Sequence, residues 1–272
     1  MKKISLKNIY RLCIFSLRTH KKLILAWSFA IFSIMTLYMI LFSSIQEMAE
    51  IKMEAMPQEL LQFVGMEDFS EMSNYVSYFG IIFGIVLVAI AIFGASYSSS
   101  LITKEEKSKS IEFLSTLPIS RTEIFVANYF SSTIAVAITL YTAVFATIIC
   151  GFIQGGESFV LADVIQISKI CSFIPLLFSA ISLGLAGISS KIASGTFCSM
   201  VVLGSYMLGY LGTLLNDDGK ILSYASPFIS LSAEKSLELS SETIIILLIY
   251  FAIYFTFLFV GNYFYSKRDL NV

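Results

Sequence analysis

Six long apolar runs, separated by short polar segments, dominate the pattern of this chain. Each run carries at most one charged residue, and the six cover residues 23–45, 74–102, 124–153, 164–190, 192–216 and 243–266. Each also reaches the ~20 residues that a helix needs to cross ~30 Å of hydrocarbon. The runs are continuous rather than alternating, which excludes the strands of a membrane barrel. The sequence therefore predicts an all-α membrane protein with six transmembrane helices in one domain, residues 1–272.

The residues before the first run are basic and amphipathic. Apolar side chains recur at helical spacing (Leu6, Ile9, Tyr10, Cys13, Leu17), and the bases Lys7, Arg11 and Arg18 share another face. This pattern is typical of a helix that lies in the membrane interface beside anionic lipid. A signal peptide also begins with bases, but the apolar run that follows is too long, and no small-x-small cleavage site comes after it. We therefore expect an interfacial helix followed by a retained first span.

The polar segment between the second and third runs, residues 103–123, has its own helix signals. Thr103 and Glu106 have the spacing of a capping box, which predicts that a short helix begins there. One side of this helix would be apolar, and Pro118 would end it. Ser120 and Glu123 form a second possible capping box just before the third run. The segment is predicted to be helix, stop, helix, with an apolar side that rests either on lipid headgroups or on a partner.

The distribution of charge predicts the orientation of the chain. Charged residues are only 14% of the sequence and the net charge is −1, so no overall field favours nucleic acid as a partner. With the N-terminus inside, 14 of the 18 Lys and Arg residues fall in inner segments and only three in outer loops, whereas 14 of the 19 acids fall in outer segments. By the positive-inside rule, both termini and residues 103–123 face the cytoplasm.

Two motifs resemble one known family. Residues 111–121, Ile-Glu-Phe-Leu-Ser-Thr-Leu-Pro-Ile-Ser-Arg, resemble a segment of ABC-2 type ABC transporter permeases that reads roughly acid-x-x-G-T-L-E-L-L-L-S-x-P-I-S-R. Residues 264–270, Phe-Tyr-Ser-Lys-Arg-Asp-Leu, look like the aromatic-x-x-basic-Asp-Leu ending common in the same family. The chain departs from the family at Lys109, where a Gly is usual, and at Asn128, where a Lys is frequent. With six spans, the resemblance covers the whole chain.

The resemblance implies a function that the residues alone do not reach. In that family the first motif is a cytoplasmic coupling helix that docks into an ATPase subunit. The coupling residues implied here are Glu105, Glu106, Ile111, Glu112, Phe113, Leu114, Leu117, Pro118 and Arg121. The chain would be a permease subunit in a bacterial cytoplasmic membrane, paired with a second copy or a sister permease and with two ATPase subunits. The cargo would be a drug, a peptide or a lipid-like amphiphile, with export more common than import.

Several kinds of chemistry lack their residues in this chain. A P-loop needs G-x-x-x-x-G-K-[ST], but the only Gly-Lys, at Gly219-Lys220, is followed by Ile221. No cofactor is therefore expected on this subunit, and ATP with Mg²⁺ would bind a partner. The four cysteines form no C-x-x-C and are expected as buried apolar residues. The single histidine, His20, excludes a two-histidine zinc protease and is expected on a solvated surface, which disfavours an intramembrane hydrolase.

A secondary, ion-coupled transporter is the closer alternative. Such carriers place charged or broken-helix sites near the midplane, but Lys169 is the only charge within a span and stands near its outer end. It would serve as an interfacial anchor, a substrate contact or a partner of Asp163. The residues that could line a translocation path are Tyr97, Ser99, Asn128, Ser132 and Lys169, although packing between helices explains the hydroxyl groups equally well.

Two more features concern packing. Small residues recur at helix-packing spacing, and they serve either the bundle itself or an interface between subunits (Gly80, Gly84, Gly184, Gly187, Gly204, Gly209, Gly212). Residues 46–73, with Pro57, are expected to form short helices on the outer surface. Residues 217–242, interrupted by Pro227, resemble the re-entrant or surface helical pair that the same family often places before its last span.

Overall fold

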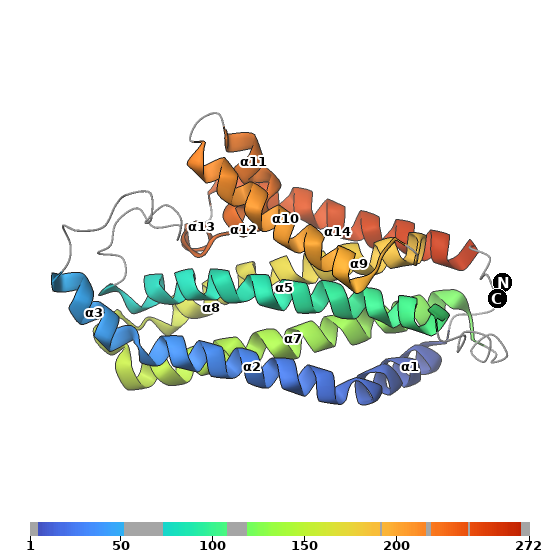
Figure 1. The fold of residues 1–272 in the computed structure, drawn as a ribbon, viewed down its shortest axis with the longest axis horizontal. Coiled ribbons are helices and arrows are strands. Elements are labelled where there is room, and N and C mark those ends of the chain that lie inside the picture. The colour runs from blue at the N-terminus through green and yellow to red at the C-terminus, as the bar shows by residue number, and fades with distance from the viewer. Residues whose placement is uncertain are drawn as a thin grey trace.

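The computed structural model describes residues 5–51, 73–107, 119–190, 192–215, 219–238 and 240–267, with only the backbone described for residues 47–51, 104–107 and 220. Throughout this part of the chain the regular structure is helical (Figure 1). Six stretches are long and apolar enough to cross a membrane. They are α2 (Lys21–Ile40), α5 (Tyr75–Lys107), α7 (Arg121–Gln154), α8 with α9 (Leu161–Cys171 and Phe173–Ile188), α10 (Gly195–Leu214) and α14 (Ser241–Lys267). The prediction of an all-α protein with six spans is confirmed.

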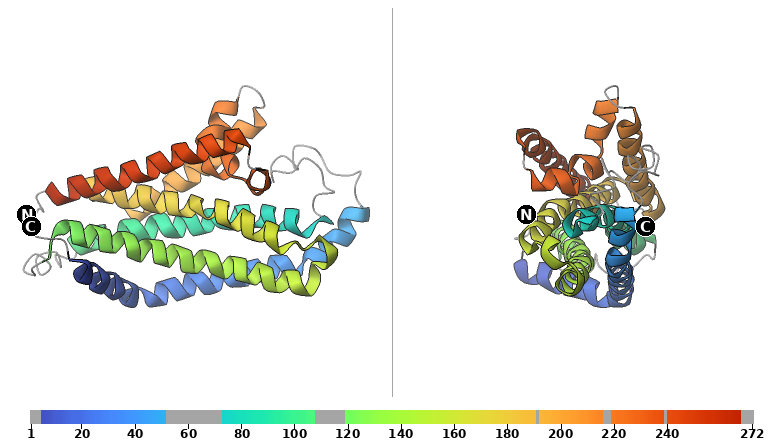
Figure 2. Two further views of the ribbon diagram at one scale, coloured as in Figure 1. Left: turned by 180° about the vertical axis from the view of Figure 1, so that it is seen from behind. Right: turned by 90° about the vertical axis from the view of Figure 1, so that its left-hand side faces the viewer.

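The helices form one bundle around α5 and α9. These two helices pack along each other, while α7 and α10 flank α5 and α14 covers α9 (Figures 1 and 2). The span of α8 and α9 is the most enclosed, with 72% of its apolar window buried, against 17% for α14. The core is made of aliphatic and aromatic side chains from all the spans, and Tyr75, Phe79, Phe83 and Met35 are completely enclosed. The exposed apolar faces of α2, α10 and α14 therefore meet lipid or another chain.

Shorter helices lie at the two ends of the bundle. The predicted amphipathic helix is present as α1 (Leu6–Thr19), and α3 (Phe42–Ile51) follows the first span. A single 3₁₀ turn, η2 (Gly156–Ser158), joins α7 to α8. Before the last span come three short helices, α11 (Lys220–Ala225), α12 (Pro227–Ser230) and α13 (Ala233–Leu237). They pack on α10, α8 and α5, and Pro227 stands at the first position of α12, where its missing N–H costs nothing.

The helices differ from the approximate predicted spans in three places. The first span ends at Ile40, five residues early, because the chain turns at Leu41 before α3 begins. The second apolar span ends at Thr103, next to the predicted 102, but its helix continues to Lys107, so the charged residues after Thr103 extend the helix. The fourth span is split between Cys171 and Phe173. Pro175 explains this break, because proline lacks the N–H that would donate to the carbonyl of Cys171 four residues earlier.

Most of the glycines serve contacts within the chain. A Cβ on Gly184 would strike the backbone at Phe257, and one on Gly261 would lie 2.5 Å from the Cα of Gly184, so α9 and α14 pack backbone to backbone. Gly209 and Gly212 likewise receive α11 and the residues around Ser226. Gly84 and Gly204 differ, since a Cβ there would meet nothing within 4 Å. The small residues were predicted to serve either packing within the bundle or an interface between subunits, and most of these glycines serve packing within the bundle.

Candidate functional site

The segment predicted to couple to a partner lies mostly outside the described residues. This applies to Ile111, Glu112, Phe113, Leu114, Leu117 and Pro118, while Glu105 and Glu106 are described only as backbone in the last turn of α5. Arg121 is the first residue of α7. The end of α5, the start of α7, the start of α1 and the end of α14 lie together at the right-hand end of the bundle in Figure 1. The two spans that flank the predicted coupling segment in the sequence therefore have their adjoining ends at the same end of the bundle as α1.

One of the two predicted capping boxes is wrong and the other is confirmed. Thr103 begins no helix, because it lies inside α5 and its hydroxyl donates to the carbonyl of Ser99 at 3.0 Å. This bond back to the preceding turn satisfies the hydroxyl without ending the helix. At the start of α7, the Ser120 hydroxyl accepts from the Glu123 N–H at 3.3 Å, and the Glu123 carboxylate accepts from the Ser120 N–H at 2.7 Å. Glu123 thus fixes the first turn of α7.

The carboxylate of Glu123 also holds α1 in place. Its Oε1 accepts from the backbone N–H of Ser5 at 2.6 Å and from Nδ2 of Asn8 at 3.4 Å. Only 2% of Glu123 is exposed, so a charge this enclosed needs several donors around it. Each carboxylate oxygen serves one helix: Oε2 accepts hydrogen bonds at the α7 cap, and Oε1 accepts them at the first turn of α1. A single side chain therefore joins two helices that are 118 positions apart along the chain.

Helix α1 rests on α7 through one side and leaves its bases outward. Ile9, Cys13 and Ser16 are buried against the bundle. On the other side the exposed bases stand between large apolar residues, of which Leu6 is 82% and Phe15 68% exposed. The predicted single apolar face is therefore divided, with one part on α7 and another free for the membrane interface. This combination of bases and apolar groups suits the boundary between headgroups and acyl chains.

His20, at the junction of α1 and α2, differs from its prediction as a solvated residue. It is half-buried, its ring packs edge-on against Tyr97 with centroids 5.5 Å apart, and its Nδ1 lies 3.0 Å from the carbonyl of Ser16. Trp27 adds a second contact between α2 and α5, with its ring centroid 5.3 Å from that of Phe93. These rings attach the N-terminal helices to the bundle.

Three of the residues predicted to line a path lie inside the packed bundle. The Tyr97 hydroxyl lies 3.3 Å from Oγ of Ser131, and the Ser99 hydroxyl donates to the carbonyl of Ala193. Ser132 belongs to a triangle with Ser98 and Ser179, in which the hydroxyl oxygens are 2.5 to 2.8 Å apart. Ser98 also donates to the Gly94 carbonyl. In this conformation these hydroxyls hold α5, α7 and α9 together.

The other two path residues are placed differently. Asn128 is 3% exposed, and its Nδ2 has no hydrogen-bond partner within the described residues. Lys169 is exposed and comes from α8, a helix that contributes none of the other four. The five predicted path residues therefore do not form one cluster. Ser179, which completes the serine triangle, was missed because an isolated serine in an apolar span gives no sequence signal.

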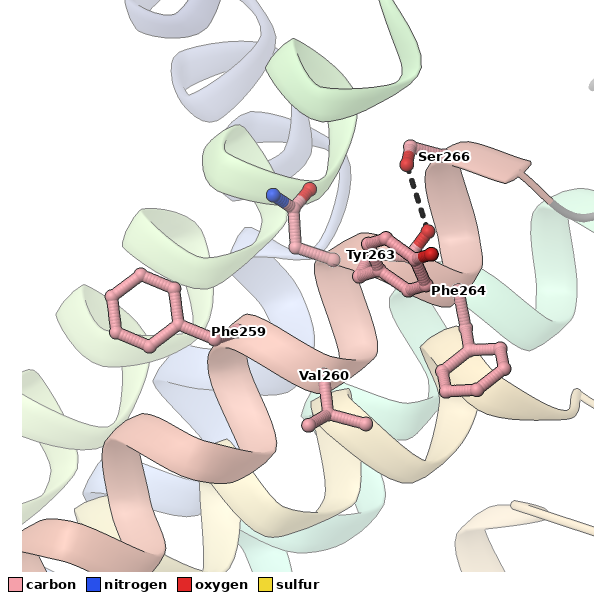
Figure 3. A pocket seen from close by; sticks show the side chains of 6 residues that line it. Phe259, Val260, Tyr263, Phe264 and Ser266 are labelled. Carbon is pink, nitrogen blue, oxygen red and sulfur yellow. Dashed lines mark hydrogen bonds between the residues drawn. The ribbon is translucent and has the colours of Figure 1, made fainter.

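A groove on α14 is visible close to the end of the chain. Figure 3 shows Phe259, Val260, Tyr263, Phe264 and Ser266 around it, all from α14. The only hydrogen bond drawn joins the Ser266 hydroxyl to the Tyr263 carbonyl at 2.8 Å. Because one helix supplies the whole lining, the groove is part of the exposed aromatic face of α14 and brings no reactive groups together.

The cysteines and possible metal ligands add no second site. All four cysteines, Cys13, Cys150, Cys171 and Cys198, are buried free thiols, as predicted. Within the ranges that the structure describes, no group of three or more His, Cys, Asp or Glu side chains is placed to hold a metal ion.

Comparison with known proteins adds one family. A protein-family model described as "Multidrug efflux system permease Rv1217c, C-terminal domain" matches residues 13–264. The match spans the second half of α1 and all six membrane-spanning stretches almost to the end of α14. No curated protein matches the chain.

Proposed function

Since this chain belongs to the family of the multidrug efflux system permease Rv1217c C-terminal domain, we propose that it is the permease subunit of an ATP-driven ABC exporter. The family match over residues 13–264 carries the efflux part of the proposal. The ABC part is supported by the resemblance of residues 111–121 to the coupling segment of ABC-2 type permeases. The cargo would be a drug or another amphiphile, and ATP with Mg²⁺ would bind a separate cytoplasmic subunit.

The geometry around the coupling segment supports this role. The segment connects α5 and α7, which both contribute to the serine triangle inside the bundle. At its far side Glu123 joins the start of α7 to α1. A push on residues 108–118 would therefore reach two spans and the interfacial helix together. The chain would work with a second permease copy or a sister permease, for which the exposed faces of α2, α10 and α14 offer surface.

Docking of the ATPase provides the test. We expect Phe113→Ala with Leu114→Ala to weaken co-purification of the ATPase by roughly a hundredfold, if the two losses reach ~3 kcal/mol together. Export should fall in parallel at equal membrane abundance.

The chain offers a matched control for this double variant. Phe152 and Ile153 are also adjacent, stand at the other end of α7, and are 71% and 74% exposed. Phe152→Ala with Ile153→Ala should leave both export and co-purification unchanged. If the Phe113 and Leu114 variant behaves like this control, residues 108–118 are a connecting loop on lipid and the ABC assignment loses its main support.

A further inference from the structure

A cavity of about 320 Å³ lies between α5, α10 and the short helices α12 and α13. Its walls are largely apolar and aromatic, with Ile81, Ile167 and Phe228 beside the rings of Tyr206 and Tyr210. The cavity falls at the lower end of the size range of small-molecule sites, which combine apolar walls with a few polar groups. None of the five residues predicted to line a path contributes to it.

Two glycines of α5 shape this cavity in different ways. At Gly80 a Cβ would lie 2.5 Å from the Cβ of Ala233, so α13 packs directly on α5 there. One turn further on, a Cβ at Gly84 would meet nothing within 4 Å, although Gly84 lines the cavity. Gly80 thus lets the wall close, whereas Gly84 leaves space that a side chain would fill.

The cavity lining combines one charged residue with a long wall formed by α5. Glu234 of α13 is the only charged residue among its described lining residues, and it is exposed. Along α5 the lining runs from Val76 to Ile85, a length of about 14 Å in a helix. Ile85 is 53% exposed, so the wall formed by α5 is partly open to the surroundings of the bundle. A molecule that fits would place a charged group at Glu234 and an apolar body along α5.

We infer that this cavity binds amphiphilic organic cations of drug size. The exposed carboxylate of Glu234 in the lining attracts a positive group and repels an anion. The tyrosine rings offer faces that attract an organic cation, and the aliphatic walls accommodate its apolar part. This assignment names the cargo class of the efflux permease, and its role as a cargo site rests on the function proposed above.

Binding to the purified chain tests the site without an ATPase. The probes are tetraphenylphosphonium and tetraphenylborate, which have nearly the same shape and opposite charges, measured by equilibrium dialysis against protein in detergent micelles with empty micelles as the blank. We expect saturable binding of the phosphonium and only micelle-like partition of the borate. Glu234→Gln should weaken phosphonium binding about fivefold, the scale of an exposed ion pair. Glu238→Gln, which changes an exposed acid outside the lining, should not.

Filling the cavity gives a second, independent readout. Gly84→Leu should reduce phosphonium binding at least tenfold, because its side chain would occupy the open space. Gly204→Leu is the matched control, since Gly204 has equally open surroundings on α10 but lies outside the lining. At both helical glycines an added Cβ meets nothing within 4 Å, so we expect both variants to elute like the wild type.

The outcomes separate this inference from the proposed function. Absent phosphonium binding, or binding unchanged by Gly84→Leu, overturns the cation site, whatever the ATPase does. Binding of both ions that Gly84→Leu abolishes would mean an apolar lipid-chain cavity and would also overturn it. Normal cation binding without any co-purifying ATPase would support the site and remove the proposed function instead. Loss of phosphonium export in Gly84→Leu, with co-purification of the ATPase intact, would support both.

Discussion

Glu123 illustrates how much of the arrangement at one end of the bundle depends on a single side chain. Its carboxylate accepts from two backbone N–H groups, those of Ser5 and Ser120, and from the side chains of Asn8 and Ser120. At 2% exposure, little water is available to replace a lost donor. An amide in its place would turn an NH₂ group toward donors that need an acceptor.

We expect Glu123→Gln to lower the unfolding midpoint in detergent by about 5 °C. Hydrogen bonds to a charged group are worth ~1.5–3 kcal/mol, and ~1 kcal/mol shifts the midpoint by ~2–4 °C in a chain of this size. Thermal unfolding followed by size exclusion measures the shift. Glu242→Gln is the control, because Glu242 is also in the first turn of a span, α14, but is exposed. Equal midpoints for the two variants would contradict the role of Glu123 as a tether.

The same residue shows what the sequence could predict and what it could not. The cap between Ser120 and Glu123 is a local pattern of two residues three positions apart, and its prediction is confirmed. The bond to Ser5 joins positions 118 apart, and no periodicity encodes such a contact. Thr103 failed for a related reason, since the same residue types suit a cap or a bond back to the preceding turn, and only the neighbouring helices decide.

At the element scale, hydropathy predicts six helical spans, because the backbone N–H and C=O groups of each span must form their hydrogen bonds within that span. The break between α8 and α9 depends on Pro175, which a hydropathy pattern does not register. The cavity at Gly84 could not be predicted from the sequence either. Gly80 and Gly84 form one GxxxG in the sequence, yet one is packed on α13 and the other faces open space.

The contact between α9 and α14 predicts that glycine-to-alanine substitutions inside and outside it change the stability of the protein in opposite directions. Gly261→Ala should destabilise the protein by about 1–3 kcal/mol, since its Cβ would press on the Cα of Gly184. Gly204→Ala should stabilise it by about 0.5–1 kcal/mol, because alanine favours helix and nothing lies nearby. Chemical unfolding in mixed micelles compares the two. A loss of stability at Gly204 as large as at Gly261 would show that Gly204 is buried against another subunit.

At the scale of the whole molecule, the ends of the bundle differ in charge and in structure. The end that holds the start of α1 and the end of α14 carries Lys7, Arg121 and Lys267, and the opposite end carries Glu157 in η2 and Asp163 in α8. An even number of spans returns the chain to the side on which it began. The positive-inside rule then predicts which side that is.

Labelling of single cysteines in intact cells tests this orientation. In a background without the four native cysteines, Glu157→Cys in η2 and Ile221→Cys in α11 should react with a membrane-impermeant maleimide, because both positions are exposed at the end predicted to be outside. Lys267→Cys, exposed at the last turn of α14, should react only after the cells are opened. This orientation is predicted from the 14 inner and three outer bases. The reverse pattern would place residues 108–118 outside the cell, where no ATPase could reach them, and the proposed coupling would fail with the orientation.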